Sequence, residues 1–312
     1  MLRVATDCSG IEAPIFALKN LKVRFVHVWS SEIDVNCTKN IMANCKPQLF
    51  FEDMSKRDVS QLPDIDMYVC GFPCQPFSSL HAINYQKDPN TKDKRKNMVN
   101  HCYDVIKIKQ PCCFVLENVP KLVTEDGGRK FKSILKKLST LGPYEINHAI
   151  LNTADFDVPQ MRKRLYIVGI RKDTLKKSFE FPTPIPQTKT LEDFLVDKKR
   201  YPLRKETMSV RLQERLPADH NRKMYAIKWR AGEGTCINMT PCITTSTDIY
   251  VTKYNRNLTP WEKLYLQGFP RTFKNVVSEA QLQKQAGNAM SVNVLEALFK
   301  EIFKAWGVKM KK

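Results

Sequence analysis

Cys74 is the residue of this chain best placed to act as a nucleophile. It lies in the segment 71–76 (Gly-Phe-Pro-Cys-Gln-Pro), directly after the apolar run 66–70, which has the composition of a buried strand. A strand that ends there presents the thiol at its carboxyl end, where open α/β sheets hold their ligands. The two prolines restrict the backbone on either side of the thiol. The alternative is that Cys74 is a small buried hydrophobic residue, as many free cysteines are.

Two further segments place polar side chains at the ends of predicted strands. Glu117 follows the apolar run 112–116, while Arg162 and Arg164 lead into the apolar run 165–170. A Glu that faces the same cleft as a thiol can hold or protonate a heterocycle. Arginines two apart in an extended segment point the same way, so both are expected to face the cleft. The alternatives are a helix-capping or surface Glu and a solvated basic patch.

The first predicted strand leads into Ser9-Gly10 and then a helix, which is a pattern for cofactor binding. A glycine at this turn lets a ligand approach the backbone, and the helix N-terminus favours a carboxylate or phosphate. Glu32 follows the second strand, where an acidic side chain can hold ribose hydroxyls. The GxGxxG run of dinucleotide sites is missing from the sequence, so a nucleoside that carries a carboxylate, such as S-adenosylmethionine (AdoMet), fits better. An ordinary βα turn followed by a surface Glu is the alternative.

Apolar strand-like runs alternate with amphipathic helical runs over the first 170 residues. This alternation predicts an α/β fold with a doubly wound, mostly parallel sheet. The predicted strands are 2–7, 23–29, 48–51, 66–70, 112–117, 146–151 and 165–170, and the predicted helices are 11–20, 33–43, 98–109 and 129–140. The polar, basic segment 81–98 interrupts the pattern after Cys74 and is interpreted as a mobile lid over the thiol.

The pattern changes at Lys172. From there to about Arg256, prolines and charges are frequent and the alternation stops, which predicts a second, smaller and irregular domain. Thr259, Pro260 and Glu262 then have the spacing of a helix start, with Gly268 as its end, and a final helix is predicted over roughly 291–306. The expected organisation is a first domain (1–171), a second domain (172–256) and a C-terminal segment (257–312) that returns to the first domain.

The charge of the chain indicates a polyanionic partner. The 312 residues contain 51 Lys and Arg against 32 acidic residues, for a net charge of +19, and nucleic acid is the usual partner of such a protein. Solvated basic faces are the alternative. The apolar runs are only strand-sized and the N-terminus does not have the layout of a signal peptide, so an intracellular protein is expected. The ten cysteines include no CxxC pair and no zinc-finger spacing to His, so reduced thiols and no metal site are expected.

Taken in order, these segments resemble the C5-cytosine DNA methyltransferase family. The resemblance covers most of the chain; each motif is short, but their order and spacing together are specific. The motifs are Ser9-Gly10, Glu32, Asp53-Met54, Gly71-Phe72-Pro73-Cys74-Gln75, Glu117-Asn118-Val119, Gln160-x-Arg162-x-Arg164, Leu258-Thr259-x-x-Glu262, Gly268-Phe269-Pro270 and Gln285-x-Gly287-Asn288.

The resemblance implies an AdoMet-dependent methyltransferase fold with a target-recognition domain at 172–256. Cys74 is then the nucleophile that adds to C6 of cytosine and activates C5 towards the methyl group of AdoMet. Glu117 binds the N3 and N4 edge of the base, while Arg162 and Arg164 secure its O2 side and the neighbourhood of Glu117. Since C6 lies inside the stacked duplex, the target base has to be flipped out.

The resemblance also implies a cofactor site. Gly10, in the Ser9-Gly10 turn, lines the methionine end of AdoMet, Glu32 holds the ribose, and Asp53 and Met54 contact the adenine. Phe72 and Asn288 lie close by. The family commonly has Phe-Ser-Gly followed by Gly-Gly, where this chain has Cys8-Ser9-Gly10 and then Glu12-Ala13, and Ile33 takes a place that is often aromatic.

The expected partner is double-stranded DNA, bound by a monomer without an obligatory protein partner. The rival readings are a tRNA methyltransferase of the same family and a catalytically dead relative that binds DNA. Gly71-Phe72 before the cysteine favours DNA, and the presence of Cys74 and Glu117 favours activity. Arg222, Lys223, Arg230 and the run 240–246 are predicted to contact DNA. Roles in restriction–modification, in a virus or phage, and in gene regulation are all compatible with the sequence.

Overall fold

The computed structural model describes residues 1–73, 98–196, 217–219, 223–228, 235–246 and 248–308. They form two compact units. Unit 1 comprises Met1–Leu151, Lys163–Pro182 and the chain from Leu295 on, and unit 2 comprises Asn152–Arg162 and Thr183–Val294.

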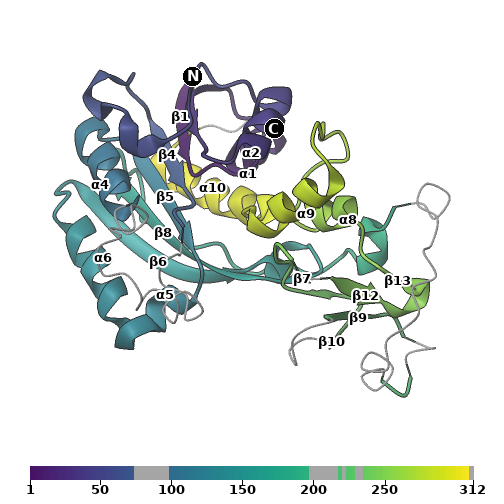
Figure 1. The fold of residues 1–312 in the computed structure, drawn as a ribbon. Coiled ribbons are helices and arrows are strands. Elements are labelled where there is room, and N and C mark those ends of the chain that lie inside the picture. Colours follow the sequence, from purple (N-terminus) through teal and green to yellow (C-terminus); the bar gives the residue numbers. More distant parts are fainter. Residues whose placement is uncertain (74–97, 197–216, 220–222, 229–234, 247, 309–312) are drawn as a thin grey trace, which may run out of the picture. The chain divides into compact units, whose positions relative to one another are not determined.

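Unit 1 is built on a seven-stranded sheet in the order β3-β2-β1-β4-β5-β8-β6 (Figure 1). The pairs from β3 to β5 are parallel, whereas β5 and β8 are antiparallel. This arrangement confirms the predicted α/β fold with a mostly parallel sheet. The strands are β1 (Leu2–Asp7), β2 (Phe25–Ser31), β3 (Leu49–Phe51), β4 (Met67–Cys70), β5 (Cys113–Asn118), β6 (Tyr144–Asn152) and β8 (Lys163–Arg171).

Helices cover both faces of this sheet. One face carries α4 (Met98–Lys109), α5 (Lys121–Thr124) and α6 (Arg129–Ser139), and the other carries α1 (Ala13–Asn20), α2 (Val35–Asn44) and the unit 1 part of α10 (Val292–Trp306) (Figure 1). The prediction of a helix over 98–109 is confirmed to the residue, and the other predicted helices of unit 1 differ by a few residues at their ends. The part of the chain that the structure describes has no helix long and apolar enough to cross a membrane.

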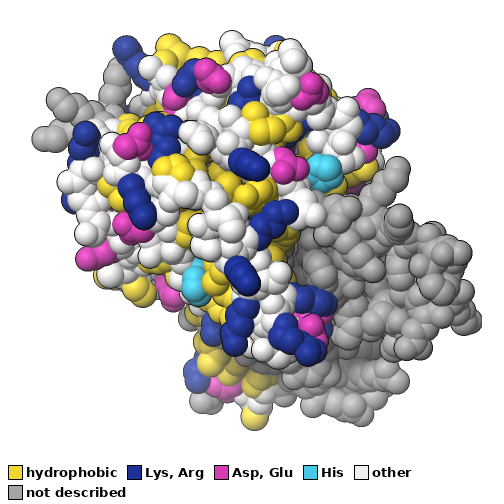
Figure 2. Space-filling view, turned by 90° about the vertical axis from the view of Figure 1, so that its left-hand side faces the viewer, with side chains coloured by type: hydrophobic (Ala, Val, Ile, Leu, Met, Phe, Trp, Pro, Cys, Tyr) yellow, Lys and Arg dark blue, Asp and Glu magenta, His cyan; other side chains and the backbone are white. Residues whose placement is uncertain are grey.

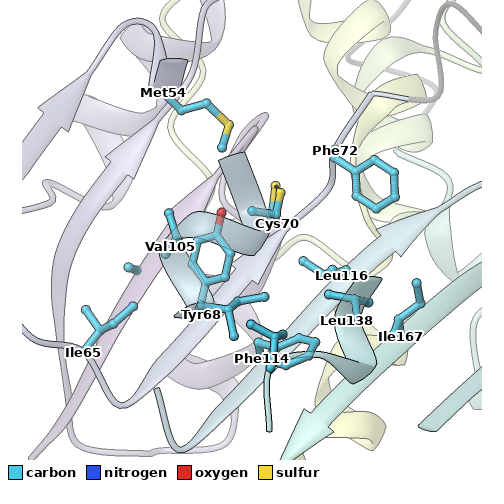
Figure 3. Close-up of a cluster of buried hydrophobic side chains, with 14 of the residues drawn as sticks. Met54, Ile65, Tyr68, Cys70, Phe72, Val105, Phe114, Leu116, Leu138 and Ile167 are labelled. Carbon is cyan, nitrogen blue, oxygen red and sulfur yellow. Dashed lines mark hydrogen bonds between the residues drawn. The ribbon is translucent and has the colours of Figure 1, made fainter. Parts of the chain in front are cut away.

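The core between the sheet and the α4–α6 layer comes from alternate positions of the central strands. Tyr68, Cys70, Phe114, Leu116 and Ile167 are almost completely buried there. Burying a large apolar side chain contributes about 1.5–3 kcal/mol, so this cluster supplies much of the stability of unit 1. Figure 3 shows Cys70, together with Met54 and Phe72, at the end of the cluster where β4 stops. The same packing therefore positions the chain just before Cys74.

Unit 2 has less regular structure. Its described residues contain a four-stranded sheet in the order β10-β9-β12-β13, a two-stranded sheet β11-β7 and the α-helices α8 and α9. The elements are β7 (Gln160–Met161), β9 (Tyr225–Lys228), β10 (Thr235–Ile237), β11 (Thr240–Pro241), β12 (Ile249–Val251), β13 (Arg256–Asn257), α8 (Pro260–Tyr265) and α9 (Glu279–Asn288). Unit 2 contains 183–256 and also 257–294, while 172–182 belongs to unit 1. Target recognition by 172–256 stays a prediction.

The start of α8 is the capping box that the sequence predicts. Thr259 accepts a hydrogen bond from the Glu262 backbone, and the Glu262 carboxylate accepts one from the Thr259 backbone. The carboxylate is completely buried and also pairs with the Arg256 guanidinium at 2.6 Å and accepts from the backbone N–H of Val196 at 3.0 Å. Glu262 therefore joins three segments of unit 2, which explains the motif in structural terms.

Candidate functional site

The candidate site lies at the carboxyl edge of the unit 1 sheet. β1, β2, β4 and β5 are parallel and end at Asp7, Ser31, Cys70 and Asn118. Because parallel neighbours end at the same edge, the residues that follow them meet there. The predicted site residues that this edge brings together are Ser9, Gly10, Glu32, Phe72 and Glu117.

Gly10 and Glu32 are joined directly. The Gly10 backbone N–H donates to Oε2 of Glu32 at 2.7 Å, and the Asp34 backbone N–H donates to Oε1 at 3.0 Å. Burial raises the pKa of Glu32, and the two backbone donors oppose that shift. Gly10 has φ 57°, and a Cβ at this position would meet no atom within 4 Å. The turn thus leaves open space beside a fixed carboxylate.

Asp53 and Met54 begin the short 3-10 helix η1 (Met54–Lys56). Asp53 caps it by accepting from the Ser55 backbone at 2.9 Å and from the Ser55 hydroxyl at 2.6 Å. Met54 is buried, with its sulfur 3.8 Å from Sγ of Cys8. Asp53 also lines a cavity of about 580 Å³ together with Leu49, Phe50, Phe51, Glu52, Lys56, Arg57, Asp58, Gln61 and Leu62.

A buried ion pair beneath this edge was missed from the sequence. Arg57 donates from Nη1 to Oδ1 of Asp7 at 2.7 Å, and Tyr68 donates to Oδ2 of Asp7 at 2.7 Å. The Arg57 guanidinium carbon lies 5.4 Å and 5.3 Å from the ring centres of Trp29 and Phe51. These contacts hold the ends of β1 to β4 in place. Asp7 at a strand end was the available signal, but nothing in the sequence marks Arg57, fifty positions away, as its partner.

Glu117 and Arg164 form the polar pair of the site. They project from the neighbouring strands β5 and β8, with Nε of Arg164 3.3 Å from Oε1 of Glu117. The side chains retain 12% and 15% exposure, so the carboxylate is partly desolvated and still accessible to a ligand. This geometry suits a carboxylate that contacts a heterocycle while its charge is balanced from the other side.

Asn118 connects the end of β5 to the chain that leads to Cys74. Its Nδ2 donates to the carbonyl oxygen of Phe72 at 3.0 Å, and its Oδ1 accepts from the Val119 backbone at 2.8 Å. Phe72 itself is 3% exposed. Cys74 lies outside the described residues, as do Arg222, Arg230 and the predicted lid apart from its last residue, Met98.

Arg162 belongs to unit 2 and is 1% exposed. Its guanidinium donates to the carbonyl oxygens of Ile243 at 2.8 Å, Gly287 at 3.2 Å and Ala289 at 2.8 Å. Arg162 lies between β7 and β8 and not inside one continuous strand. The alternation of side chains along a strand therefore does not determine the direction in which Arg162 points. These contacts cross-link unit 2, and a direct role of Arg162 at the base stays a prediction.

Asn288 is the last residue of α9, also in unit 2. The neighbouring Gly287 explains much of its motif: a Cβ there would lie 2.3 Å from the backbone nitrogen of Thr245. Thr240, which was predicted to contact DNA, is fully buried, and its hydroxyl donates to the Pro159 carbonyl at 3.3 Å. The predicted cofactor role of Asn288 stays a prediction.

The residues at the unit 1 edge fit AdoMet. Glu32 offers carboxylate oxygens for ribose hydroxyls, Met54 and Phe72 are apolar, and the open turn at Gly10 suits an amino-acid group. Within the described residues, no group of three or more His, Cys, Asp or Glu side chains is arranged to hold a metal ion.

Comparisons with known proteins agree over nearly the whole chain. A family model described as C-5 cytosine-specific DNA methylase matches residues 6–304. The chain is 36% identical to the type II methyltransferase M.NgoBI of Neisseria gonorrhoeae over 87% of this chain and 84% of that protein. It is 35% identical to the type II methyltransferase M.HaeII of Haemophilus aegyptius over 93% and 86%. A solved structure described as an Escherichia coli prophage DNA modification methyltransferase has the same fold, with a TM-score of 0.73 at 20% identity over 98% of this chain and all of that one.

Proposed function

The chain belongs to the C-5 cytosine-specific DNA methylase family, and we propose that it methylates cytosine in a specific DNA sequence through a covalent bond between Cys74 and the base. The observation that carries this proposal is the meeting of two polar links at one sheet edge. Asn118, at the end of β5, donates a hydrogen bond to the backbone of Phe72, two residues before Cys74. Glu117, the preceding residue of β5, pairs with Arg164 of β8. The predicted nucleophile and the predicted base-binding carboxylate are therefore attached to neighbouring strand ends.

The proposed reaction begins at the thiolate of Cys74. The sulfur adds to C6 of cytosine, and the C5–C6 π electrons move to make C5 nucleophilic. When bound, AdoMet would supply the electrophilic methyl group that C5 takes up, and its sulfur would leave with the bonding electron pair as the neutral thioether S-adenosylhomocysteine. Loss of the C5 proton to a base then restores the double bond and expels the thiolate, so the enzyme is regenerated.

Glu117 is proposed to hold the N3 and N4 edge of the base. Its carboxylate lies 3.3 Å from Arg164, which fixes one oxygen and leaves the group partly exposed. A carboxylate at this edge can accept from the amino group, and its protonated form can donate to N3 and so offset the negative charge that develops there when sulfur attacks. Arg164 thereby supports the orientation and charge of Glu117.

Double-stranded DNA is the proposed substrate. C6 is inaccessible in a stacked duplex, so the base is proposed to flip out, which costs a few kcal/mol. The net charge of +19 favours phosphate binding. On the face of unit 1 that Figure 2 shows, Lys and Arg side chains are spread widely among a smaller number of acidic ones. The named relatives are type II methyltransferases, so we assign this chain the same kind of sequence-specific modification.

The test compares Cys74→Ala with Cys45→Ala, a substitution at a half-buried cysteine after α2. Bisulfite sequencing of DNA from cells that express each variant reports both activity and target sequence. We expect wild type and Cys45→Ala to methylate a defined site and Cys74→Ala to be inactive. A duplex with 5-fluorocytosine at that site should trap wild type covalently, because fluorine blocks the loss of the C5 proton.

Full activity of Cys74→Ala would contradict the covalent mechanism. Incorporation of labelled methyl groups into tRNA and not into duplex DNA would contradict the substrate but leave the chemistry of Cys74 in place.

A further inference from the structure

Glu12 is a completely buried acidic residue directly after the cofactor turn, and the reaction proposed above does not use it. It is the N-cap of α1 and has φ 66° and ψ 43°, in the left-handed region. A glycine adopts this conformation freely, whereas another residue there pays about 1–2 kcal/mol. A strained backbone that also buries a carboxylate is a reason to look for a function of that carboxylate.

The Glu12 carboxylate is the centre of a hydrogen-bond network beneath the turn. Its Oε1 accepts from the Thr6 hydroxyl at 2.8 Å and from the Ser30 hydroxyl at 2.5 Å. Ser9 donates to the Thr6 hydroxyl at 3.2 Å and lies 3.0 Å from the Ser30 hydroxyl. His27 Nε2 lies 3.6 Å from Glu12 Oε1 and 3.0 Å from the Thr6 hydroxyl. The network thus connects Glu12 to β1, to β2 and to the Ser9-Gly10 turn.

The charged groups around Glu12 leave its ionisation finely balanced. Burial raises the pKa of Glu12 to about 7, although the Ser30 and Thr6 hydroxyls stabilise the anion. Burial lowers the pKa of His27 to about 4, so this neighbour is neutral at pH 7. Glu32 adds a like charge, and Lys19 acts on the pair from α1 by disfavouring the charged form of His27. Cys45 follows the end of α2, and burial is the main reason that the pKa of its thiol is raised. The negative charge of Glu12 raises the pKa of the Cys45 thiol further.

We propose that Glu12 is a positioning residue for AdoMet that holds the cofactor turn and loses its proton when the cationic cofactor binds. This inference rests on the proposed function. AdoMet carries a sulfonium, an ammonium and a carboxylate, so its net charge is +1, whereas the product S-adenosylhomocysteine lacks the sulfonium and has no net charge. A nearby cation favours the ionised form of a carboxylate. Glu12 therefore makes the site prefer the cofactor over the spent product, and increasingly so above pH 7.

Calorimetry with the purified protein tests the coupling. AdoMet is titrated into wild type and Glu12→Gln at pH 7 in phosphate and in Tris, whose ionisation enthalpies differ, so that the protons released can be counted. Gln keeps the acceptor for Thr6 and Ser30 but cannot ionise. We expect wild type to release up to about half a proton more per AdoMet than Glu12→Gln. The α-amino group of the ligand titrates equally in both experiments and cancels.

The pH dependence of affinity gives a second readout. Between pH 6 and pH 8, the affinity of wild type for AdoMet should rise relative to Glu12→Gln by as much as about tenfold. S-adenosylhomocysteine should show a smaller change. Ser30→Ala removes one donor to the carboxylate, so it should keep the pH dependence but move its midpoint upward. A residue that only supports the fold would change none of these pH profiles.

Equal proton release and parallel pH profiles for wild type and Glu12→Gln would overturn the inference while leaving AdoMet binding established. Absence of AdoMet binding by wild type at every pH would instead overturn the cofactor assignment and this inference with it. Glu12→Gly serves as a second variant because glycine accepts φ 66° without strain. Like Glu12→Gln, it should lack the extra proton release and the rise of AdoMet affinity with pH that are expected for wild type. The test therefore stays decisive if Glu12→Gln folds poorly.

Discussion

Asn118 donates a hydrogen bond from its side-chain amide to the carbonyl oxygen of Phe72 at 3.0 Å. This contact joins the end of β5 to the segment that leads to Cys74. Asn118→Asp keeps the acceptor for the Val119 backbone but removes the donor to Phe72. We expect the rate of methyl transfer in a single turnover to fall about tenfold or more, because the nucleophile is displaced. AdoMet affinity, measured by calorimetry, should change little, and an unchanged transfer rate would contradict this role of Asn118.

Substitutions of the Glu117–Arg164 pair should affect the chemical step in different degrees. Glu117→Gln removes the charge that contacts the base and should lower the turnover number by about 10²-fold or more. Arg164→Lys keeps a positive charge without the planar guanidinium, so a smaller loss is expected. Rapid-quench kinetics with a saturating DNA duplex measure which of the two substitutions slows methyl transfer more. If Arg164→Lys were the slower enzyme, Arg164 would have a more direct role than support of Glu117.

Gly287→Ala should destabilise unit 2 even though alanine is the better helix former. The added Cβ would lie 2.3 Å from the backbone nitrogen of Thr245, so backbone has to move. We expect a loss of about 3 kcal/mol in the free energy of unfolding, measured by urea denaturation. Gly127→Ala is the control, because Gly127 has φ 61° and open space around it, and it should lose only about 1–2 kcal/mol. Equal losses would mean that the close approach at Thr245 has no energetic effect.

The buried Glu12 and His27 should make stability depend on pH in opposite directions. The folded pKa of Glu12 is raised to about 7 from 4.5, so its favourable contribution is present below pH 4.5 and lost as pH rises through 7. The folded pKa of His27 is lowered to about 4 from 6.5, so its contribution is present above pH 6.5 and lost as pH falls through 4. The two effects largely cancel between pH 4.5 and 6.5, and stability should fall above pH 6.5.

Glu12→Gln isolates these two contributions. It should remove the loss above pH 6.5, which amounts to about 1 kcal/mol for wild type because only the last half unit below the folded pKa of about 7 lies in that range. The variant should instead gain stability from pH 4 to 6.5, because over this range His27 is neutral in the folded protein and still protonated in the unfolded chain. Denaturant titrations at pH 4, 6.5 and 8 measure the difference, and parallel curves for the two proteins would show that Glu12 does not titrate in this range.

The sequence by itself determined the features that depend on neighbouring residues. The alternating strands and helices of unit 1, the capping box of Thr259 and Glu262, and the polar residues at strand ends all follow from local pattern. Parallel strands then bring their carboxyl ends to one edge. The sequence could therefore predict that the Gly10 turn and Glu32 lie close together, although not the hydrogen bond between them. The family motifs along the chain were likewise readable in order.

Only the tertiary structure decided which side chains pair across the chain. Arg57 neutralises Asp7 from fifty positions away, and Arg162 donates to carbonyl groups of residues 243, 287 and 289. Glu12 looked like a departure from a glycine motif and is the buried centre of a polar network. Such pairings depend on burial and on contacts distant in sequence. A local pattern shows that a residue is charged, but its partners and its solvent exposure decide what that charge does.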